Sequence, residues 1–493
     1  MPFLPPLFFT AFFLRLCPLF RFFSLWALCA LLAGLCGLCP LPEQAWAAGT
    51  GMRAGGAVDP VYGGGRRLAP PGGDALPDAP LTMPEAVDRA LRFNPGLGAQ
   101  EAQSRSSESG RKAARSAFGP KLGTSYSVAR QERESSSPVA AKPPSRGVYS
   151  WGVEVSQPVF QGFRLLASYQ KAALQADSDK AALRKAELDM TQKVQTQFLN
   201  CLRYDEDVRS KRDALARLQD QLRITTAFHK VGLRPRLDVL QAEVDVREAE
   251  QALIQAETSR DTSLSALNIL LGLPASARVK YVGTLRHVPF SRSLEQCLEA
   301  AWRQRPDLYM AAKSVEIAGK SRQVVQSGYY PQVEAYYNVT ESGNTPDLKK
   351  AGKNGSHSVT WEAGARLTWD VFQWGTTYHA DREAGWLVTK MRHEEANLRL
   401  TVGHDVKSCL LALREAEKRI RVAEKSVEQA SEAYAAALAR YQERVGTNFE
   451  VLDASSKLTS SQAALTSARA DYLTSLSRMY VVMGEFHPNL LRH

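Results

Sequence analysis

Cysteine is scarce in this chain of 493 residues once the N-terminus is set aside. Four of the seven cysteines lie within the first 47 residues. The other three, Cys201, Cys297 and Cys409, are far apart in sequence, and each lies in a segment with helical periodicity. This distribution excludes a disulfide framework, so we interpret the three as small apolar side chains.

Residue patterns for metal, phosphate and nucleophile chemistry are also missing. The eight histidines show no metal-ligand spacing, and His393, which precedes Glu394, lacks a second histidine four residues later. The Gly-Lys-Ser sequence at 319–321 lacks the earlier glycine of a phosphate-binding loop and lies in a helical segment. The sequence therefore predicts no cofactor, no metal site and no catalytic residue, and any energy source must lie in another protein.

A large excess of one charge sign is absent as well. The 62 basic and 51 acidic side chains give a net charge of +11, which alone is compatible with nucleic acid or an anionic surface as a partner. However, both signs are interleaved along helix-like segments, as is typical of solvated helix faces. We therefore expect no nucleic-acid partner.

The N-terminus has the pattern of a secretory signal. Two arginines precede the apolar run FFSLWALCALLAGLCGL, and Ala45 and Ala47 have the spacing of a signal-peptidase site. Residues 1–47 are thus predicted to be a signal peptide, with a retained membrane anchor as the alternative. A lipid anchor is disfavoured because leucine precedes each cysteine of the apolar run. Residues 48–80 are rich in glycine and proline and predict a linker.

The remaining sequence contains two related copies of one unit. A shift of 211 residues aligns Pro120 with Pro331, and the sequence Val-Phe-Gln occurs at both Val159 and Val371. Such internal similarity indicates a duplication in which each copy has a helix, a strand pair and a long helical hairpin. The predicted units are 81–290 for the first repeat, 291–485 for the second and 486–493 for a C-terminal tail.

Each repeat contains the pattern of one antiparallel strand pair. Apolar residues alternate with polar ones, which is the period of a strand with one apolar face, and polar loops connect the strands. In an exported protein this pattern favours a membrane barrel with a wet lumen, whereas the alternative is a soluble sheet that rests on the helices. The predicted lipid-facing residues are Trp151, Val153, Val155, Trp361, Ala363, Ala365, Leu367 and Trp369.

Long helices follow both strand pairs. Between Val402 and Tyr441, apolar residues recur at spacings of four and three, a heptad pattern that indicates helices wound around their neighbours. No proline interrupts either helical segment, so each predicts a helix of about 67 residues, on the order of 100 Å long. Both helices are expected to end where a glycine takes the left-handed conformation, at Gly232 and at Gly446.

The small number of strands constrains how a barrel could form. Four strands cannot surround a pore, since roughly eight are needed to enclose even packed side chains. Two copies of the chain would supply eight strands and three would supply twelve, and the pattern leaves both open. Where a strand ends, a glycine would let the chain turn sharply into a helix, and a phenylalanine would fill the junction. The residues predicted for these strand-to-helix turns are Pro158, Phe160, Gly162, Phe372 and Gly375.

These segments resemble the outer-membrane efflux proteins, the TolC family. The sequences QPVFQGF and DVFQWG are similar to the strand-to-helix signature of the family, and VGLRPRLDVLQA and VGTNFEVLDA are similar to its tip signature. The resemblance covers about residues 81–485, in both repeats. It implies an α+β membrane protein in which a long coiled-coil α-barrel joins a transmembrane β-barrel shared between three copies, with four strands from each.

The resemblance also implies a location and a function. The chain is expected in the outer membrane of a Gram-negative bacterium, with a large periplasmic portion, as the passive exit duct of a tripartite efflux pump or a type I secretion system. Its implied partners are two further copies, outer-membrane lipid, a periplasmic adaptor (membrane fusion) protein and an inner-membrane RND or ABC transporter. The implied adaptor contacts lie at the hairpin tips, at Val231, Gly232, Leu233, Val445, Gly446 and Thr447.

In that family the hairpin tips close the duct through polar bonds and acidic residues. By resemblance, the aperture residues are Asp238, Arg444, Asn448, Glu450 and Asp453. Asn448 stands where the family usually has a base, which leaves Arg444 as a substitute. The alternative is that the acids are ordinary first-turn residues favoured by the helix dipole.

A periplasmic coiled-coil scaffold without a pore is the alternative function. It explains the heptads but does not explain the alternation of apolar and polar residues in the strands.

Overall fold

The computed structural model describes residues 80–131, 146–348, 357–487 and 490. The chain divides into two units, residues 1–63 and residues 64–493, and every described residue belongs to the second. The predicted signal peptide and the predicted linker up to residue 79 therefore lie outside the described residues, as do most of the predicted strand-connecting loops.

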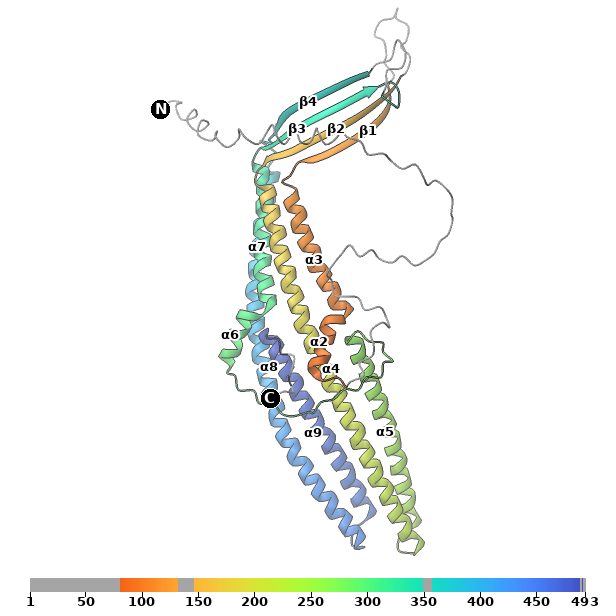
Figure 1. Cartoon of the computed structure of the whole chain (residues 1–493). Coiled ribbons are helices and arrows are strands. Elements are labelled where there is room, and N and C mark those ends of the chain that lie inside the picture. The colour runs from red at the N-terminus through yellow and green to blue at the C-terminus, as the bar shows by residue number, and fades with distance from the viewer. Residues whose placement is uncertain (1–79, 132–145, 349–356, 488–489, 491–493) are drawn as a thin grey trace, which may run out of the picture. The chain divides into compact units, whose positions relative to one another are not determined.

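The same order of elements occurs twice (Figure 1). Each run has two short helices, two strands and two long helices. The first run comprises α2 (Met83–Phe93), α3 (Pro95–Ser116), β1 (Lys121–Gln131), β2 (Arg146–Gln161), α4 (Arg164–Lys230) and α5 (Arg236–Leu270). The second comprises α6 (Leu294–Gln304), α7 (Pro306–Gln326), the 3₁₀ turn η1 (Ser327–Tyr329), β3 (Gln332–Gly343), β4 (His357–Thr368), α8 (Thr376–Gln442) and α9 (Asn448–Met483).

The starts of the short helices follow local sequence signals. Ser293 caps α6: its side chain accepts a hydrogen bond from the backbone of Gln296 at 3.3 Å, and the Gln296 side chain accepts one from the backbone of Ser293 at 3.0 Å. This reciprocal capping box satisfies backbone donors that a helix start leaves free. Pro95 and Pro306 stand at the start of α3 and α7, where a proline costs no helical hydrogen bond.

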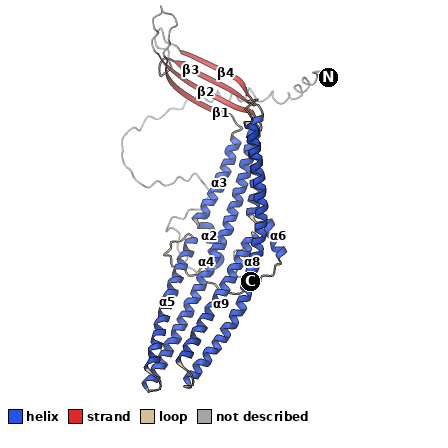
Figure 2. Ribbon diagram, turned by 180° about the vertical axis from the view of Figure 1, so that it is seen from behind, coloured by secondary structure: helices blue, strands red, loops and turns tan. Residues whose placement is uncertain are grey.

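The four strands form one antiparallel sheet in the order β1-β2-β3-β4 (Figure 2). Within the described chain, β1 and β4 each pair on one side only. The pairing of β2 with β3 shifts between Pro158 and Phe160, so Val159 is an extra, bulged residue. Pro158 therefore lies inside β2 beside the bulge and not in the strand-to-helix turn. A proline is tolerated there because the ladder is already interrupted.

The two longest helices, α4 and α8, have 67 residues each, which confirms the predicted length. Next to the sheet the neighbouring helices follow the order α3-α4-α7-α8, and farther from it they follow the order α5-α4-α9-α8. In both layers α8 is one edge of the chain, while α3 or α5 is the other. Among the described residues, each layer, like the sheet, thus has two unpartnered edges.

The heptad residues of α8 form a buried seam, as predicted. The buried members are Val402, Val406, Cys409, Leu413, Ala416, Ile420, Ala423 and Tyr441. The main apolar core joins α2, α4, α8 and α9 to the segment that follows α5.

Cys201, Cys297 and Cys409 are buried and free of disulfides, in agreement with the sequence interpretation. Burial raises the pKa of the Cys201 thiol to about 11, so this thiol stays protonated and unreactive at neutral pH.

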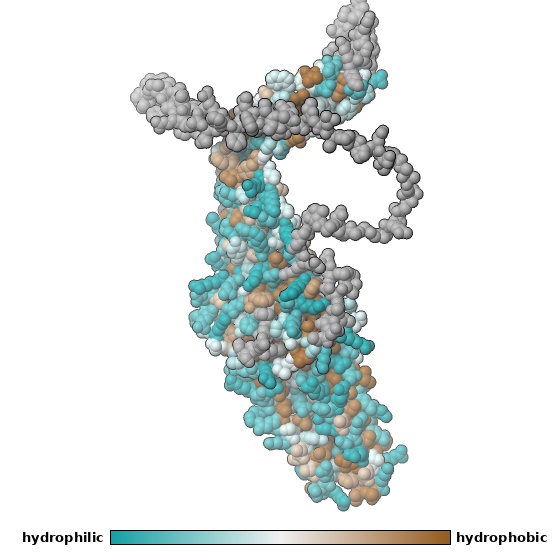
Figure 3. Space-filling model, in the orientation of Figure 1, coloured by the Kyte–Doolittle hydropathy of each residue, from teal (hydrophilic) through white to brown (hydrophobic). Residues whose placement is uncertain are grey.

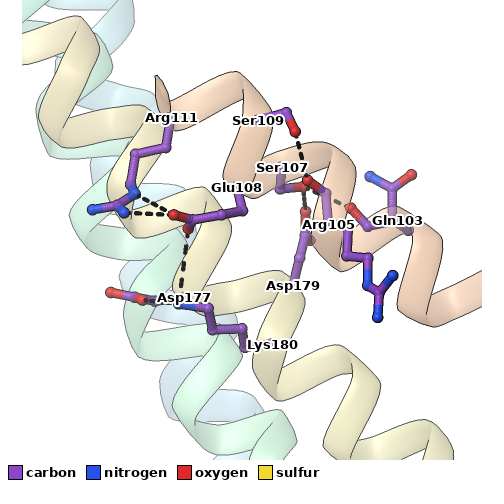
Figure 4. A network of polar contacts seen from close by, with 9 residues as sticks. All are labelled: Gln103, Arg105, Ser107, Glu108, Ser109, Arg111, Asp177, Asp179 and Lys180. Carbon is purple, nitrogen blue, oxygen red and sulfur yellow. Dashed lines mark hydrogen bonds and ion pairs between the residues drawn. The ribbon is translucent and has the colours of Figure 1, made fainter. Parts of the chain in front are cut away.

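The contact between α3 and α4 is polar (Figure 4). Ser107 on α3 donates a hydrogen bond to Asp179 on α4. Glu108 accepts hydrogen bonds from Arg111 and lies 3.9 Å from Lys180 on α4. The Arg111 hydrogen bond is the main cause that lowers the pKa of Glu108, so its carboxylate stays charged. Polar side chains therefore supply much of the contact between these two helices.

Candidate functional site: the sheet faces, the junctions and the hairpin tips

One face of the sheet is apolar across all four strands. Thr124, Val153, Val339 and Trp361 lie opposite one another in successive strands, and cross-strand partners share a face. The same register places seven of the predicted residues on this face: Trp151, Val153, Val155, Trp361, Ala363, Ala365 and Leu367. At the end nearest the strand-connecting loops, the face ends in a polar contact of 2.7 Å between the Glu341 carboxylate and the His357 ring.

The eighth residue, Trp369, follows the last residue of β4. Its indole N–H donates a hydrogen bond of 3.3 Å to the carbonyl of Tyr329 in η1. Trp369 is 52% exposed and lies just beyond the end of the strand.

The opposite face of the sheet is polar. One of its rows is made of Ser125, Gly152, Thr340 and Thr360. The strands have 11, 16, 12 and 12 residues, which is enough for a tilted strand to cross a bilayer core, since that needs about 9–11. Among the helices of the described ranges, none has an apolar stretch long enough to span a membrane.

Two consecutive left-handed residues form each strand-to-helix junction. At the first junction they are Gly162 (φ 56°) and Phe163 (φ 66°), and at the second they are Trp374 (φ 49°) and Gly375 (φ 80°). The glycine and the aromatic residue thus exchange places between the repeats. The two predicted glycines have the expected conformation, but the sequence analysis missed their left-handed aromatic neighbours. A side chain rarely adopts this conformation because Cβ approaches the carbonyl oxygen.

The aromatic side chains of the two junctions differ in burial. Phe160 packs edge-on against Phe163 with ring centroids 5.3 Å apart, and Phe163 meets Tyr330 at 5.9 Å. By contrast, Phe372 and Trp374 are 71% and 90% exposed. Phe160 is therefore half-buried at its junction, whereas Phe372 packs against Trp374 with ring centroids 5.2 Å apart but stays largely exposed.

The first hairpin tip, residues 231–235, ends α4 as the sequence predicts. Gly232 has a φ of 76°, and its backbone N–H bonds the carbonyl of His229 at 2.9 Å. Nothing lies within 4 Å of the position that a Cβ would take. The glycine is required here by its backbone conformation alone.

The second tip, residues 443–447, ends differently from the prediction. The helix α8 ends at Gln442, and the left-handed residue is Arg444 (φ 67°), not Gly446. The backbone N–H groups of Val445 and Gly446 both bond the carbonyl of Arg440, which folds this loop back on the helix. A Cβ on Gly446 would lie 3.1 Å from the backbone nitrogen of Tyr441. Gly446 is therefore needed for close packing and not for a left-handed turn.

A buried polar network joins the two tips of one chain. Gln221 on α4 donates a hydrogen bond of 2.7 Å to Asn448 on α9, and the hydroxyls of Thr225 and Tyr441 lie 3.0 Å apart. Arg234 of the first tip donates a hydrogen bond of 2.6 Å to the carbonyl of Gly446 and lies 5.0 Å from the Tyr441 ring. The sequence analysis missed Gln221 and Thr225, because their partners lie more than 200 residues away in the sequence.

The predicted aperture residues occupy several environments. Asn448 is buried in the network just described. Glu450 lies 3.9 Å from Arg440, and Asp453 is held by Lys457 at 2.7 Å. Asp238 is half-buried in the first turn of α5, and Arg444 is exposed. Within the described part of the chain, neither Asp238 nor Arg444 has an ion-pair partner.

The tips also expose apolar side chains (Figure 3). Val231 and Leu233 are 67% and 46% exposed, and Val445 and Phe449 are 73% and 74% exposed. Thr447 caps α9 by accepting a hydrogen bond of 3.3 Å from the backbone of Glu450. The tips thus combine a polar interior with an apolar outer surface.

Comparisons with known proteins agree with this geometry. The sequence profile of the outer membrane efflux protein family matches residues 86–273 and again residues 297–485. The alkaline protease secretion protein AprF of Pseudomonas aeruginosa is 22% identical over 342 residues, covering 67% of this chain and 69% of that protein. The outer membrane protein TolC of Vibrio cholerae serotype O1 is 25% identical over 350 residues, covering 69% of this chain and 78% of TolC.

A solved structure shares the fold. The CmeC outer membrane channel of Campylobacter jejuni superposes with a TM-score of 0.72 at 15% identity, covering 91% of this chain and 94% of CmeC. The profile match spans most of the chain and repeats in register with the two runs of elements. The chain therefore belongs to the outer membrane efflux protein family, whose members are channels of the Gram-negative outer membrane and not enzymes.

Proposed function

We propose that this chain is the exit duct of a tripartite efflux pump or a type I secretion system, fed by an inner-membrane RND or ABC transporter through a periplasmic adaptor. The observation that carries the proposal is a four-stranded sheet with one apolar face, one polar face and, within the described part of the chain, two unpaired edges. The names of the relatives support an export role, because AprF is a secretion protein and CmeC is an outer membrane channel.

The unpartnered edges are closed by further copies of the chain. β4 of one copy pairs with β1 of the next, while α8 meets α3 near the sheet and α5 near the tips. Two copies would give eight strands, a barrel whose interior is filled by side chains. Three copies give twelve strands, which leave room for water. A duct therefore requires a homotrimer, with the apolar face toward lipid and the polar face toward the lumen.

The duct closes at the hairpin tips. Asp238 lies on α5 and Arg444 is the second residue after α8, so ring closure brings these two edge residues together between copies. Within each copy, the contact of Arg234 with Gly446 and Tyr441 makes both tips move together. The exposed Val231, Leu233, Val445 and Phe449 are the surface that the adaptor covers.

The gate is tested by exchanging charges. In planar lipid bilayers, Asp238→Lys and Arg444→Asp should each raise the basal conductance, because each replaces an attraction between copies with a repulsion. At about 0.5 kcal/mol per exposed pair, three pairs give about 1.5 kcal/mol, or about a tenfold rise in open probability. The double variant restores the pair and should return the conductance toward that of the wild type.

Arg223→Asp is the matched control. Arg223 lies near the same tip, but its partner, Asp220, is on its own helix at 3.0 Å. We expect the wild-type conductance from this variant. If the single variants at Asp238 and Arg444 also conducted like the wild type, the proposed closing pair would be wrong.

A further inference from the structure

The last residues of β2 pair with β3 only. The pairing of β2 with β1 stops where Ser156 lies opposite Lys121, whereas its pairing with β3 continues until Gln161 lies opposite Gln332. This contact joins the end of a strand pair in the first repeat to the start of the strand pair in the second. It is therefore the contact by which one repeat meets the next.

The equivalent residues after β4 lack such a neighbour. Residues 369–373 share the sequence Val-Phe-Gln with residues 157–161. However, β4 ends at Thr368, and among the described strands none pairs with residues 369–373. Val371 and Phe372 are 73% and 71% exposed. This segment thus has the sequence of a strand end but no strand to pair with.

The segment before β1 has the same turn as the segment before β3. A shift of 211 residues relates the two, and the backbone N–H groups of Tyr330 and Gly119 bond the carbonyls of Ser327 and Ser116 at 3.2 Å and 3.0 Å. Ser327 is only 4% exposed, because the first junction lies against it, with a Cβ on Gly162 only 2.6 Å from its carbonyl oxygen. Ser116 is exposed. The start of β1 therefore lacks the cover that the start of β3 has.

Resting on the homotrimer proposed above, we propose that residues 369–374 of one copy pack on residues 119–122 of the next, as residues 157–162 pack on residues 330–333 within each copy. A contact between two different surfaces repeats around a ring until the ring closes. Phe160 lies opposite Val333, so the same register places Phe372 opposite Leu122 of the next copy. Leu122 is 76% exposed in a single chain. The contact buries an apolar side chain from each copy.

A large side chain changes sides between the two contacts. Within one copy, a Cβ on Gly162 would lie 2.9 Å from the Cβ of Tyr330, so the aromatic ring belongs to the segment before β3. Between copies, Trp374 stands in place of Gly162, and Gly119 stands in place of Tyr330. Trp374, at 90% exposed, therefore covers Gly119 of the next copy. Because Trp374 has a Cβ, the two backbones must lie slightly farther apart here than in the contact within one copy.

The register is tested by a disulfide between copies. Residues opposite each other in antiparallel strands have Cα atoms about 4.5–5.5 Å apart, which suits a disulfide. After oxidation in membranes, the double variant Phe372→Cys with Leu122→Cys should run on non-reducing gels as covalent species of up to three chains. Each single variant should run as one chain, because the native cysteines of the described ranges are buried.

Phe372→Cys with Val128→Cys is the matched control. Val128 is 63% exposed on β1, but it lies six residues beyond Leu122, or about 20 Å along the strand. We expect no cross-link from this pair. A trimer in which Phe372→Cys with Leu122→Cys gives no cross-link, or no more than the control, would overturn the register and leave the duct standing. A wild type of one chain would overturn the homotrimer, and the register with it.

The exchange of side chains is tested by rescue. Gly119→Tyr should meet Trp374 of the next copy and lower the temperature at which the trimer dissociates on SDS gels. Adding Trp374→Gly recreates, between copies, the pair that Gly162 and Tyr330 form within one copy, so the dissociation temperature should rise again. A double variant that dissociates no later than Gly119→Tyr alone would overturn the placement of Trp374.

Discussion

A single side chain in the sheet belongs to one face only, and the register decides which. Ala363 lies near the middle of β4 and pairs with Tyr337 on the apolar face, while Thr360 lies on the polar face of the same strand. Leu367 shares the face of Ala363 but is the second-last residue of β4. A comparison of these three positions separates the effect of the sheet face on which a side chain lies from the effect of its depth in the membrane.

Arginine at these positions should give graded losses of stability. Ala363→Arg should lower the free energy of unfolding by about 2–4 kcal/mol, as expected near the bilayer midplane, and Leu367→Arg by about 0–1 kcal/mol near the interface. Thr360→Arg should have little effect, because its side chain enters water. Urea unfolding in lipid vesicles measures all three. Equal losses of stability at Ala363 and Thr360 would contradict the proposal that Ala363 faces lipid and Thr360 faces the lumen.

At the scale of single residues, the sequence predicted the alternation of side chains between the two faces well. It predicted residues with an unusual backbone conformation poorly. Alternation depends on the residues alone, so the apolar face could be identified before the register was known. The left-handed conformation of Phe163, Trp374 and Arg444 cannot be predicted from their residue types, which rarely adopt it. For the same reason, Gly446 was assigned a left-handed turn when its role is to permit close contact with Tyr441.

The junction between strand and helix is the element that the two repeats build in different ways. A Cβ on Gly162 would lie 2.6 Å from the carbonyl oxygen of Ser327, whereas a Cβ on Gly375 would approach only the flexible His379 side chain, at 3.4 Å. Both glycines are left-handed. The first junction therefore has a steric requirement that the second lacks.

Alanine should reveal this difference. Gly375→Ala should cost about 1–2 kcal/mol for the left-handed backbone, and Gly162→Ala should cost more because the backbone of η1 must also move. Gly319→Ala is the control, since nothing lies within 4 Å of its Cβ position in α7, and it should stabilise by about 0.5–1 kcal/mol. Thermal unfolding followed by circular dichroism measures the three. Equal losses at Gly162 and Gly375 would contradict the steric argument.

Long elements were the easiest to predict. The heptad repeat and the absence of proline predicted two helices of about 67 residues, because both signals accumulate over many residues. The bulge at Val159 was not predicted, because a single inserted residue produces no repeating pattern in the sequence. The network around Gln221, Asn448 and Tyr441 joins segments more than 200 residues apart, so no local pattern could reveal it.

At the scale of the whole molecule, a single chain supplies only part of the wall of a tube. The sheet and both helical layers end in edges that nothing in the described chain covers. The edge helix α8 has exposed apolar residues, such as Leu400 and Val422 at 75% and 68%. Three copies would bury these edges and close a tube of twelve strands.

The most direct test is the mass of the mature protein extracted from membranes in mild detergent, measured by native mass spectrometry. We predict a species of three chains that also inserts into lipid vesicles. A species of two chains would contradict the twelve-stranded tube. A single chain that stays in water and does not enter lipid would contradict the account as a whole and favour a coiled-coil scaffold without a pore.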